Sequence, residues 1–204
     1  MTDSSYKDWN LVYREYPAEV LPWELGRPRK TLVDLIESGT VKLGKSLDLC
    51  CGTGTNTVYM AEKGFQAVAI DISKHALKLA KQKSRKARVD IQFALASFVT
   101  LPFKEAAFDF VFDMGCFHHV EIEDRKEFIR GICQVLKPKA HYQLTCFSDR
   151  NGVAWNHFTK ERLARYFAGR FRFISLDHFG SVEGNGSTRF FYSILMQRRE
   201  KPCT

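Results

Sequence analysis

Three aspartates stand at or near the ends of apolar runs. Asp48 lies in "SLDLC", Asp71 closes "AVAID", and Asp113 lies near the end of "FDFVFDM". If these runs are neighbouring parallel strands, the three carboxylates meet at the carboxyl ends of the strands, where open α/β sheets bind ligands. Carboxylates in such a crevice accept hydrogen bonds from ribose hydroxyls and attract cationic groups.

A glycine-containing loop, "CCGTGTN", follows the first of these runs. Gly52 and Gly54 allow the backbone to approach a ligand, and a helix beginning after them offers free N–H groups. On its own this spacing is also that of a tight strand–helix turn. Asp71 follows Gly52 by 19 positions, which suits an acid that binds ribose.

The same residues discriminate between two adenosine-containing cofactors. NAD carries two negative phosphates, which nearby carboxylates repel, and its fingerprint requires glycine or alanine where this chain has Thr57. S-adenosylmethionine instead carries a ribose, an ammonium group and a sulfonium cation, and carboxylates stabilise both cations. The pattern therefore favours S-adenosylmethionine, and an NAD-dependent enzyme is the disfavoured alternative.

Five apolar runs that alternate with helical patterns must position these residues. The expected strands are 46–50, 67–71, 91–95, 108–114 and 141–147. The expected helices are 5–16, one beginning near residue 28, 55–63, one beginning at residue 73, 123–136 and one beginning at residue 159. This alternation predicts a parallel sheet that is covered on both faces. Pro138 should end the helix before the fifth strand.

The C-terminal pattern is different. Runs 171–179 and 189–197 flank the glycine-rich stretch "GSVEGNGS" and predict an antiparallel hairpin. We therefore expect an α/β fold, with a doubly wound, mostly parallel seven-stranded Rossmann-like sheet and helices on both faces. The 204 residues, 45% of them hydrophobic, suit a single domain, with an N-terminal helix and lid segment in 1–30 and the core in 31–204.

Composition restricts the environment and the partners. No apolar run approaches the roughly 20 residues that span a bilayer, and the first residues contain no apolar leader, so we expect a cytoplasmic protein. The six cysteines form no zinc-type spacing, and without a secretion signal we expect them to be reduced and mostly buried. The net charge is +8, and the basic residues are concentrated at 74–88. We interpret them as the solvent-exposed face of a helix; the alternative is a surface that binds nucleic acid.

Several stretches together resemble the class I S-adenosylmethionine-dependent methyltransferases. They are "LDLCCGTGTNTVYMAEKGFQAVAIDIS", "LPF", "FDFVFDMGCFHHV" and "VLKPKA", in that order and spacing, and they cover about 45–147. The N-terminal "PWELGRP" is similar to the corresponding segment of small-molecule thiol and halide methyltransferases and of tellurite-resistance-type methyltransferases. The resemblance implies methyl transfer from S-adenosylmethionine by in-line displacement, which leaves S-adenosylhomocysteine.

The resemblance also implies a set of cofactor-binding residues. In the first motif they are Asp48, Cys50, Gly52, Gly54 and Asn56, with Cys50 standing where the family usually has glycine. Because cysteine is small, we interpret the double cysteine as packing residues and expect no metal site.

Further residues are implied for the rest of the cofactor. Asp71 matches the acid that binds ribose, and Ile72 matches the apolar residue that packs on adenine. Ser97 stands where the family often has an aspartate that binds the adenine amine, and Phe98 is placed to cover the ring.

The resemblance implies a third group of residues, which lie near the methionine end of the cofactor and the methyl acceptor. Asp113 and Met114 match the segment that passes the methionine end, and Trp23 lies in a segment that in the family folds over the cofactor. Simple packing of the terminal helix is the alternative for that segment. His118, in "CFHHV", is a candidate general base, since histidine titrates near neutrality. The alternative is that it caps the strand end or packs in the core.

The expected methyl acceptor is a small molecule, because the chain is barely larger than the core fold. Two alternatives remain open. One is an RNA or protein methyltransferase that uses the basic helix beginning at residue 73, and the other is a non-catalytic protein that binds S-adenosylmethionine.

Overall fold

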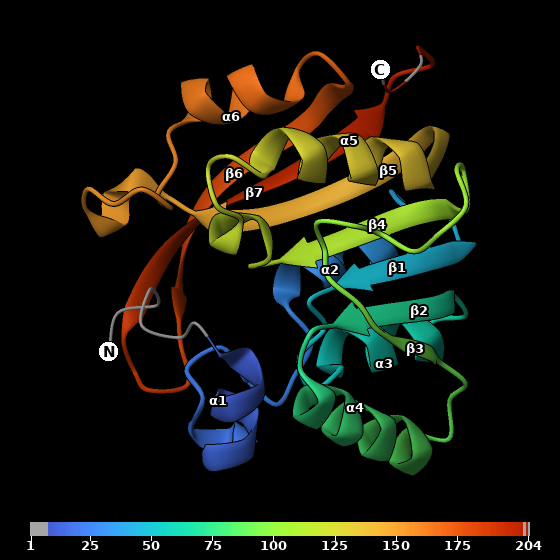
Figure 1. Cartoon of the computed structure of the whole chain (residues 1–204), viewed down its shortest axis with the longest axis vertical. Coiled ribbons are helices and arrows are strands. Elements are labelled where there is room, and N and C mark those ends of the chain that lie inside the picture. Colours follow the sequence, from blue (N-terminus) through green and yellow to red (C-terminus); the bar gives the residue numbers. More distant parts are fainter. Residues whose placement is uncertain (1–7, 202, 204) are drawn as a thin grey trace.

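The apolar runs of the sequence form one seven-stranded sheet in the computed structural model, which describes residues 8–201 and 203 (Figure 1). The strand order is β3-β2-β1-β4-β5-β7-β6. The first five strands are parallel, and β7 runs antiparallel between β5 and β6. The predicted fold class, including the C-terminal antiparallel hairpin, is confirmed. Its strands are β1 (Lys45–Leu49), β2 (Gln66–Asp71), β3 (Gln92–Leu95), β4 (Phe108–Met114), β5 (Leu136–Phe147), β6 (Phe171–Val182) and β7 (Thr188–Arg198).

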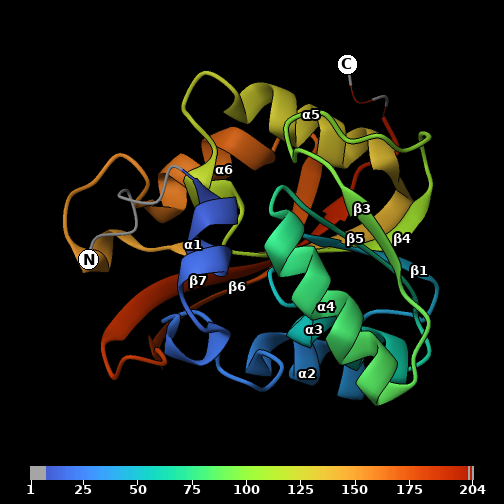
Figure 2. The same cartoon turned by 60° about the horizontal axis from the view of Figure 1, so that its bottom comes forward.

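Helices cover both faces of this sheet (Figures 1 and 2). They are α1 (Trp9–Glu15), α2 (Lys30–Glu37), α3 (Thr55–Glu62), α4 (Lys74–Ala87), α5 (Arg125–Val135) and α6 (Lys160–Phe167). Residues of α5 and α6 pack in the large core on one face, whereas α2, α3 and α4 pack on the other face. Residues 5–7 of the helix predicted over 5–16 lie outside the described residues.

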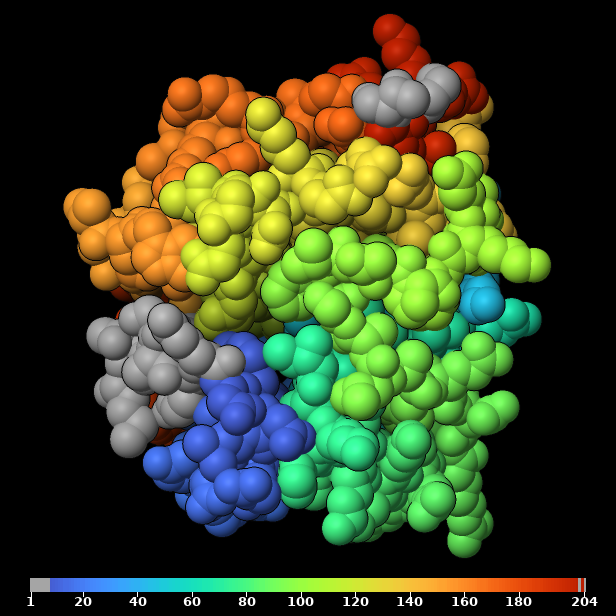
Figure 3. Space-filling view, viewed as in Figure 1, coloured from blue at the N-terminus to red at the C-terminus, as the bar shows by residue number. Residues whose placement is uncertain are grey.

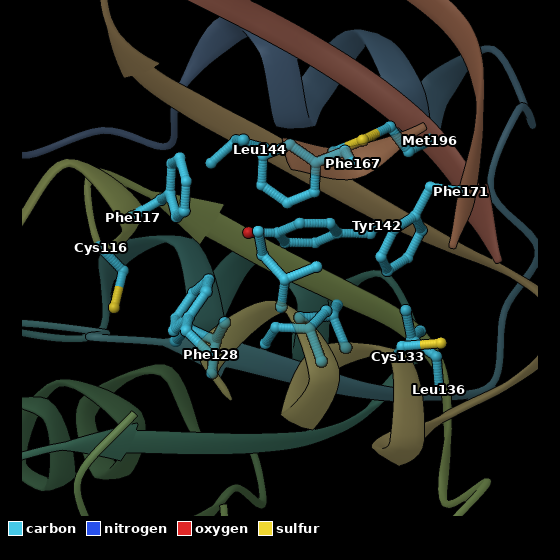
Figure 4. Packing of buried hydrophobic residues seen from close by; sticks show 14 of the residues in the cluster. Cys116, Phe117, Phe128, Cys133, Leu136, Tyr142, Leu144, Phe167, Phe171 and Met196 are labelled. Carbon is cyan, nitrogen blue, oxygen red and sulfur yellow. The ribbon is translucent and has the colours of Figure 1, made fainter. Parts of the chain in front are cut away.

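The large core is rich in aromatic side chains. Tyr142 of β5 packs against both Phe167 and Phe171, with ring centroids 6.0 and 5.7 Å away (Figure 4). All three side chains are fully buried. Burial of apolar area on this scale, at about 25 cal/mol per Å², drives α5 and α6 onto the sheet.

The junction between α5 and β5 differs from the prediction. The helix ends at Val135, and β5 begins at once with Leu136, so that Pro138 lies inside the strand. The pairing of β5 with β4 is irregular there, with a register shift between Phe108 and Phe110. A proline fits at such an irregularity because no ladder hydrogen bond is required of it.

The expectation of reduced cysteines is wrong for two pairs. The structure joins Cys50 to Cys116 and Cys133 to Cys203, whereas Cys51 and Cys146 are free and buried. Cys50 follows β1 and Cys116 follows β4, and these strands are neighbours that end at the same edge of the sheet. Sequence spacing did not reveal this pair, because its members are 66 positions apart and meet only through the strand order.

The strand order reverses between β1 and β4, which is where an open α/β sheet forms its ligand crevice. None of the helices within residues 8–201 is long and apolar enough to cross a membrane.

The close approach of α3 to α4 gives a first testable prediction. Gly54 has a φ of +76°, and a Cβ on it would lie 2.9 Å from the Cβ of Ala80 in α4. Gly39 has a similar φ of +69° but no atom within 4 Å of such a Cβ. Both Gly→Ala substitutions therefore carry the strain of a left-handed backbone, and Gly54→Ala adds a clash that typically costs about 1–3 kcal/mol.

Urea unfolding should show Gly54→Ala less stable than Gly39→Ala by about that amount. Equal losses for the two variants would mean that packing against Ala80 does not restrict this position.

Candidate functional site

A pocket of about 480 Å³ opens at the carboxyl ends of β1, β2 and β4. Three parts of the chain line it. The core contributes Cys50, Cys51, Gly52, Asn56, Asp71, Ile72, Phe98, Met114, Gly115, His118, His119 and Phe147. The segment before α2 contributes residues that include Trp9, Tyr13, Trp23, Glu24 and Arg29, and the β6–β7 hairpin contributes Glu183, Asn185, Ser187, Arg189 and Phe191.

The structure brings most of the predicted site residues together in this pocket. Those that line it are Trp23, Cys50, Gly52, Asn56, Asp71, Ile72, Phe98, Met114 and His118. Those that do not are Asp48, Gly54, Ser97 and Asp113. The predicted group of three carboxylates facing a ligand is therefore reduced to Asp71.

Asp48 forms a hydrogen bond within the protein and does not line the pocket. It is buried below the loop, and its Oδ2 accepts a hydrogen bond of 2.5 Å from the hydroxyl of Thr57 in α3. Burial raises the pKa of Asp48 to about 7, and the charges of Asp71 and Asp113 act in the same direction. Thr57, which departs from the NAD fingerprint, is thus the residue that fastens α3 to β1.

Asp113 likewise has internal partners. Its Oδ1 accepts hydrogen bonds from the backbone N–H groups of Cys116, at 2.8 Å, and Phe117, at 3.4 Å. Its Oδ2 accepts one of 2.8 Å from the hydroxyl of Tyr142. Burial raises its pKa to about 7. Asp113 therefore shapes the short helical turn Phe117–His119, which carries the two histidines.

Asp71 both lines the pocket and holds it together. Its Oδ2 accepts a hydrogen bond of 2.9 Å from the N–H of Gly52, and its Oδ1 accepts one of 2.8 Å from the N–H of Ser73. Each carboxylate oxygen keeps a further lone pair for a ligand hydroxyl. Next to it, Ile72 also lines the pocket and is 43% exposed, so its side chain is accessible to a ligand there.

Two other predicted residues have local roles instead. Ser97 is exposed, and its hydroxyl accepts a hydrogen bond from the N–H of Val99. Gly54 provides space for Ala80, as described above. Phe98 does line the pocket, with its ring edge against Phe128 at a centroid distance of 5.9 Å.

Residues 8–29, which we call the N-terminal cover, contribute one side of the pocket lining. Their helix α1 lies beside α4 (Figure 2), and their atoms meet those of α4 at the surface (Figure 3). Val12 and Tyr13 share a buried cluster with Ala76 of α4. The indole N–H of Trp23 donates a hydrogen bond of 2.9 Å to the hydroxyl of Tyr13, and Glu24 accepts one of 2.7 Å from the hydroxyl of Thr53. The two alternatives drawn from the sequence, a cover and a packed terminal helix, therefore describe the same segment.

A buried ion pair fastens this cover to the β6–β7 hairpin. Arg29 and Glu183 lie 3.3 Å apart, with side chains only 10% and 6% exposed. Arg29 also donates to the backbone oxygen of Trp23, and the N–H of Gly184 donates to the backbone oxygen of Pro22 at 2.7 Å. We call these contacts the latch.

Sequence reasoning did not identify Glu24, Arg29 or Glu183 as site residues. The available signal was a charged residue in or next to a stretch rich in proline or glycine: Glu24 lies in "PWELGRP", Arg29 follows that stretch directly, and Glu183 lies in "VEGNG". Among the described residues, no group of three histidine, cysteine, aspartate or glutamate side chains is placed to hold a metal ion.

The two histidines are neutral and differ in their contacts. His118 stacks on Phe147 at a centroid distance of 3.8 Å, and its Nδ1 accepts a hydrogen bond of 3.3 Å from the N–H of Phe147. The proton of the neutral ring is therefore on Nε2. Burial lowers the pKa of His118 well below its ordinary value, and it lowers that of His119 to about 4. His118 in this tautomer is a donor at Nε2, so the predicted role as a base requires the other tautomer.

Comparison with known proteins identifies the family. A family model described as a methyltransferase domain matches residues 47–139. An uncharacterized methyltransferase of Schizosaccharomyces pombe is 30% identical over 115 residues, which are 54% of this chain and 79% of that protein. The 2-heptyl-1-hydroxyquinolin-4(1H)-one methyltransferase of Mycobacteroides abscessus is 29% identical over 72% of this chain and 66% of its own length. A probable thiol methyltransferase of Arabidopsis thaliana is 30% identical over 68% of this chain and 60% of its own length.

Solved structures share the fold. A protein described for the conversion of a disulfide bond into a thioacetal group during echinomycin biosynthesis has a TM-score of 0.84 at 21% identity, over 94% of this chain and 91% of that one. The 1,6-didemethyltoxoflavin-N1-methyltransferase of Burkholderia thailandensis, with S-adenosylhomocysteine bound, has a TM-score of 0.70 at 20% identity, over 97% of this chain and 85% of that one. With this fold, this pocket and these relatives, the chain belongs to the class I methyltransferases whose cofactor is S-adenosylmethionine.

Proposed function

We propose that this protein transfers the methyl group of S-adenosylmethionine to a small-molecule nucleophile. The observation that carries the proposal is the enclosure of the pocket. It lies at the strand-order reversal, between the N-terminal cover and the β6–β7 hairpin, and its volume of about 480 Å³ suits a small ligand. The relatives whose names include an acceptor name a hydroxyquinolone, thiols, thiocyanate and norajmaline, and these names support the same class.

The residues at one end of the pocket fit the cofactor. Asp71 offers carboxylate lone pairs to ribose hydroxyls, while Ile72 and Phe98 offer apolar surfaces to the adenine. Gly52 leaves room for the N-terminal cover above this loop, because a Cβ there would lie 2.7 Å from the hydroxyl of Tyr13. Met114 lies in the segment that the family places beside the methionine end.

The cofactor supplies a methyl group on a sulfonium sulfur, and in-line attack forms the new bond as the carbon–sulfur bond breaks and its electron pair stays on sulfur. The chain's own contribution is to orient the reactants and exclude water. Trp23 and Tyr13 are joined by a hydrogen bond and line the pocket above the glycine loop. His118 and His119 hold no positive charge at neutral pH, because burial lowers both pKa values. A neutral imidazole is still a base, but the lowered pKa values make both histidines weak ones, so we expect the acceptor to react mainly through its own ionised form.

The alternatives drawn from the sequence make different demands on this architecture. An RNA or protein substrate bound by the basic face of α4 would have to reach a pocket that residues 8–29 cover. A non-catalytic binding protein would bind the cofactor without turning over any acceptor, so turnover by a panel of thiols, phenols and amines separates it from the enzyme.

Calorimetric titration tests the cofactor site. We expect S-adenosylmethionine and S-adenosylhomocysteine to bind and NAD not to bind. Asp71→Asn should weaken both adenosyl ligands by about 10- to 100-fold, the value of one or two hydrogen bonds to a charged group. Asp177→Asn, which neutralises an exposed carboxylate on β6, is the matched control and should leave both affinities unchanged.

Saturable NAD binding without a response to the adenosyl ligands would contradict the proposal. Thermal unfolding of ligand-free Asp71→Asn should accompany the titration, because the substitution also affects the hydrogen bonds to Gly52 and Ser73.

The neutrality of His119 predicts a pH dependence of stability. Its pKa is about 4 in the folded protein and about 6.5 in an unfolded chain, so the unfolded state takes up the proton first as the pH falls. Its contribution to the free energy of unfolding is therefore complete above about pH 6.5 and is lost between about pH 6.5 and 4. The slope should approach about 1.4 kcal/mol per pH unit.

Urea unfolding of the wild type and of His119→Gln over this range measures that contribution. The wild type should lose stability relative to the variant as the pH falls. A constant difference between the two would show that the pKa of His119 is the same in the folded and the unfolded protein, which would contradict the prediction.

A further inference from the structure

The register of the β6–β7 hairpin gathers one set of side chains on a single face of the sheet. Ser181 pairs with Arg189, and Phe147 of β5 pairs with Phe191 of β7. Because directly paired and alternate residues of a sheet point to the same side, Phe147, Arg189 and Phe191 share a face. All three line the pocket, and their strands, β5 and β7, lie on the opposite side of β4 from β1 and β2, which carry the glycine loop and Asp71.

This side of the pocket has a flat aromatic wall. His118 stacks on Phe147 at 3.8 Å with an interplanar angle of 14°, and Phe147 lies against Phe191 at 5.3 Å. On the side of the N-terminal cover, Trp9 meets His119 edge-on at 4.9 Å. Walls of this kind favour a planar ligand, because aromatic rings gain most from stacked or edge-on contact.

Two arginines, Arg29 and Arg189, line the pocket near the hairpin, and within the described part of the chain only the first of them has an ion pair. Arg29 is paired with Glu183 in the latch. Arg189 is half-buried, and among the residues that the structure describes its side chain has no ion pair and no hydrogen bond. Both histidines are neutral, so they add no charge of their own. One guanidinium therefore lies uncompensated beside the aromatic wall.

From this arrangement we propose that Arg189 is a specificity-determining residue, and that the methyl acceptor is a planar aromatic compound with an anionic group. The inference rests on the proposed function and names the acceptor class of the same pocket. A guanidinium binds a carboxylate or similar anion through two parallel hydrogen bonds, which fixes its orientation as well as its position. The ring then lies against Phe147 and Phe191, with its nucleophile directed toward the cofactor end.

Equilibrium binding tests this assignment without a turnover assay. The protein, saturated with S-adenosylhomocysteine, is titrated calorimetrically with 2-naphthoate and with 2-naphthamide, a neutral compound of the same shape. We expect 2-naphthoate to bind about 10- to 100-fold more tightly than 2-naphthamide. Arg189→Gln should remove this preference, and Arg189→Lys should restore part of it. Arg172→Gln, which removes an exposed cation bonded to Gln197, is the control for net charge and should retain the preference.

The outcomes are distinguishable. Equal affinities for the two naphthalene compounds, or an Arg189→Gln protein that still prefers 2-naphthoate, would overturn the inference while S-adenosylhomocysteine binding upheld the cofactor site. Failure of S-adenosylhomocysteine to bind would overturn the proposed function, and the inference with it. Loss of the preference in Arg172→Gln as well would assign it to overall charge and would also overturn the role of Arg189.

Discussion

The site depends on the carboxylate of Asp71. By accepting hydrogen bonds from Gly52 and Ser73, it ties the loop after β1 to the turn after β2. Those two turns open α3 and α4, so one side chain sets the relative position of both helix N-termini. Hydrogen bonds to a charged acceptor are about twice as strong as neutral ones, which makes this junction a firm base for the pocket.

A second layer of contacts completes the enclosure. The N-terminal cover contacts the glycine loop through Glu24 and Thr53, and the latch joins it to the β6–β7 hairpin through Arg29 and Glu183. Neither contact belongs to the parallel core, and both join segments far apart in the sequence. The core therefore supplies one wall, and the two ends of the chain supply the other walls.

The sequence predicts the parallel core well because its periodicity is local. Strand β2 was expected at 67–71 and lies at Gln66–Asp71, and the helix expected from Ser73 begins at Lys74 with Ser73 as its N-cap. The predictions fail where contacts between residues far apart in the sequence determine the position or partner of a side chain. Whether Asp48 and Asp113 face a ligand depends on Thr57 and Tyr142, and no pattern in the sequence links these side chains to their partners. The pairing of Cys50 with Cys116 similarly requires the strand order.

The β6–β7 hairpin carries both Glu183 of the latch, directly after β6, and Arg189 of β7, which pairs with Ser181 of β6. Its register fixes the spacing of the two, so a change that slides or bends one strand moves both side chains at once. With Arg189 in its proposed role, a change in the hairpin that suits a new acceptor also displaces Glu183 of the latch. The proposed choice of acceptor and the attachment of the N-terminal cover are then linked through one hairpin.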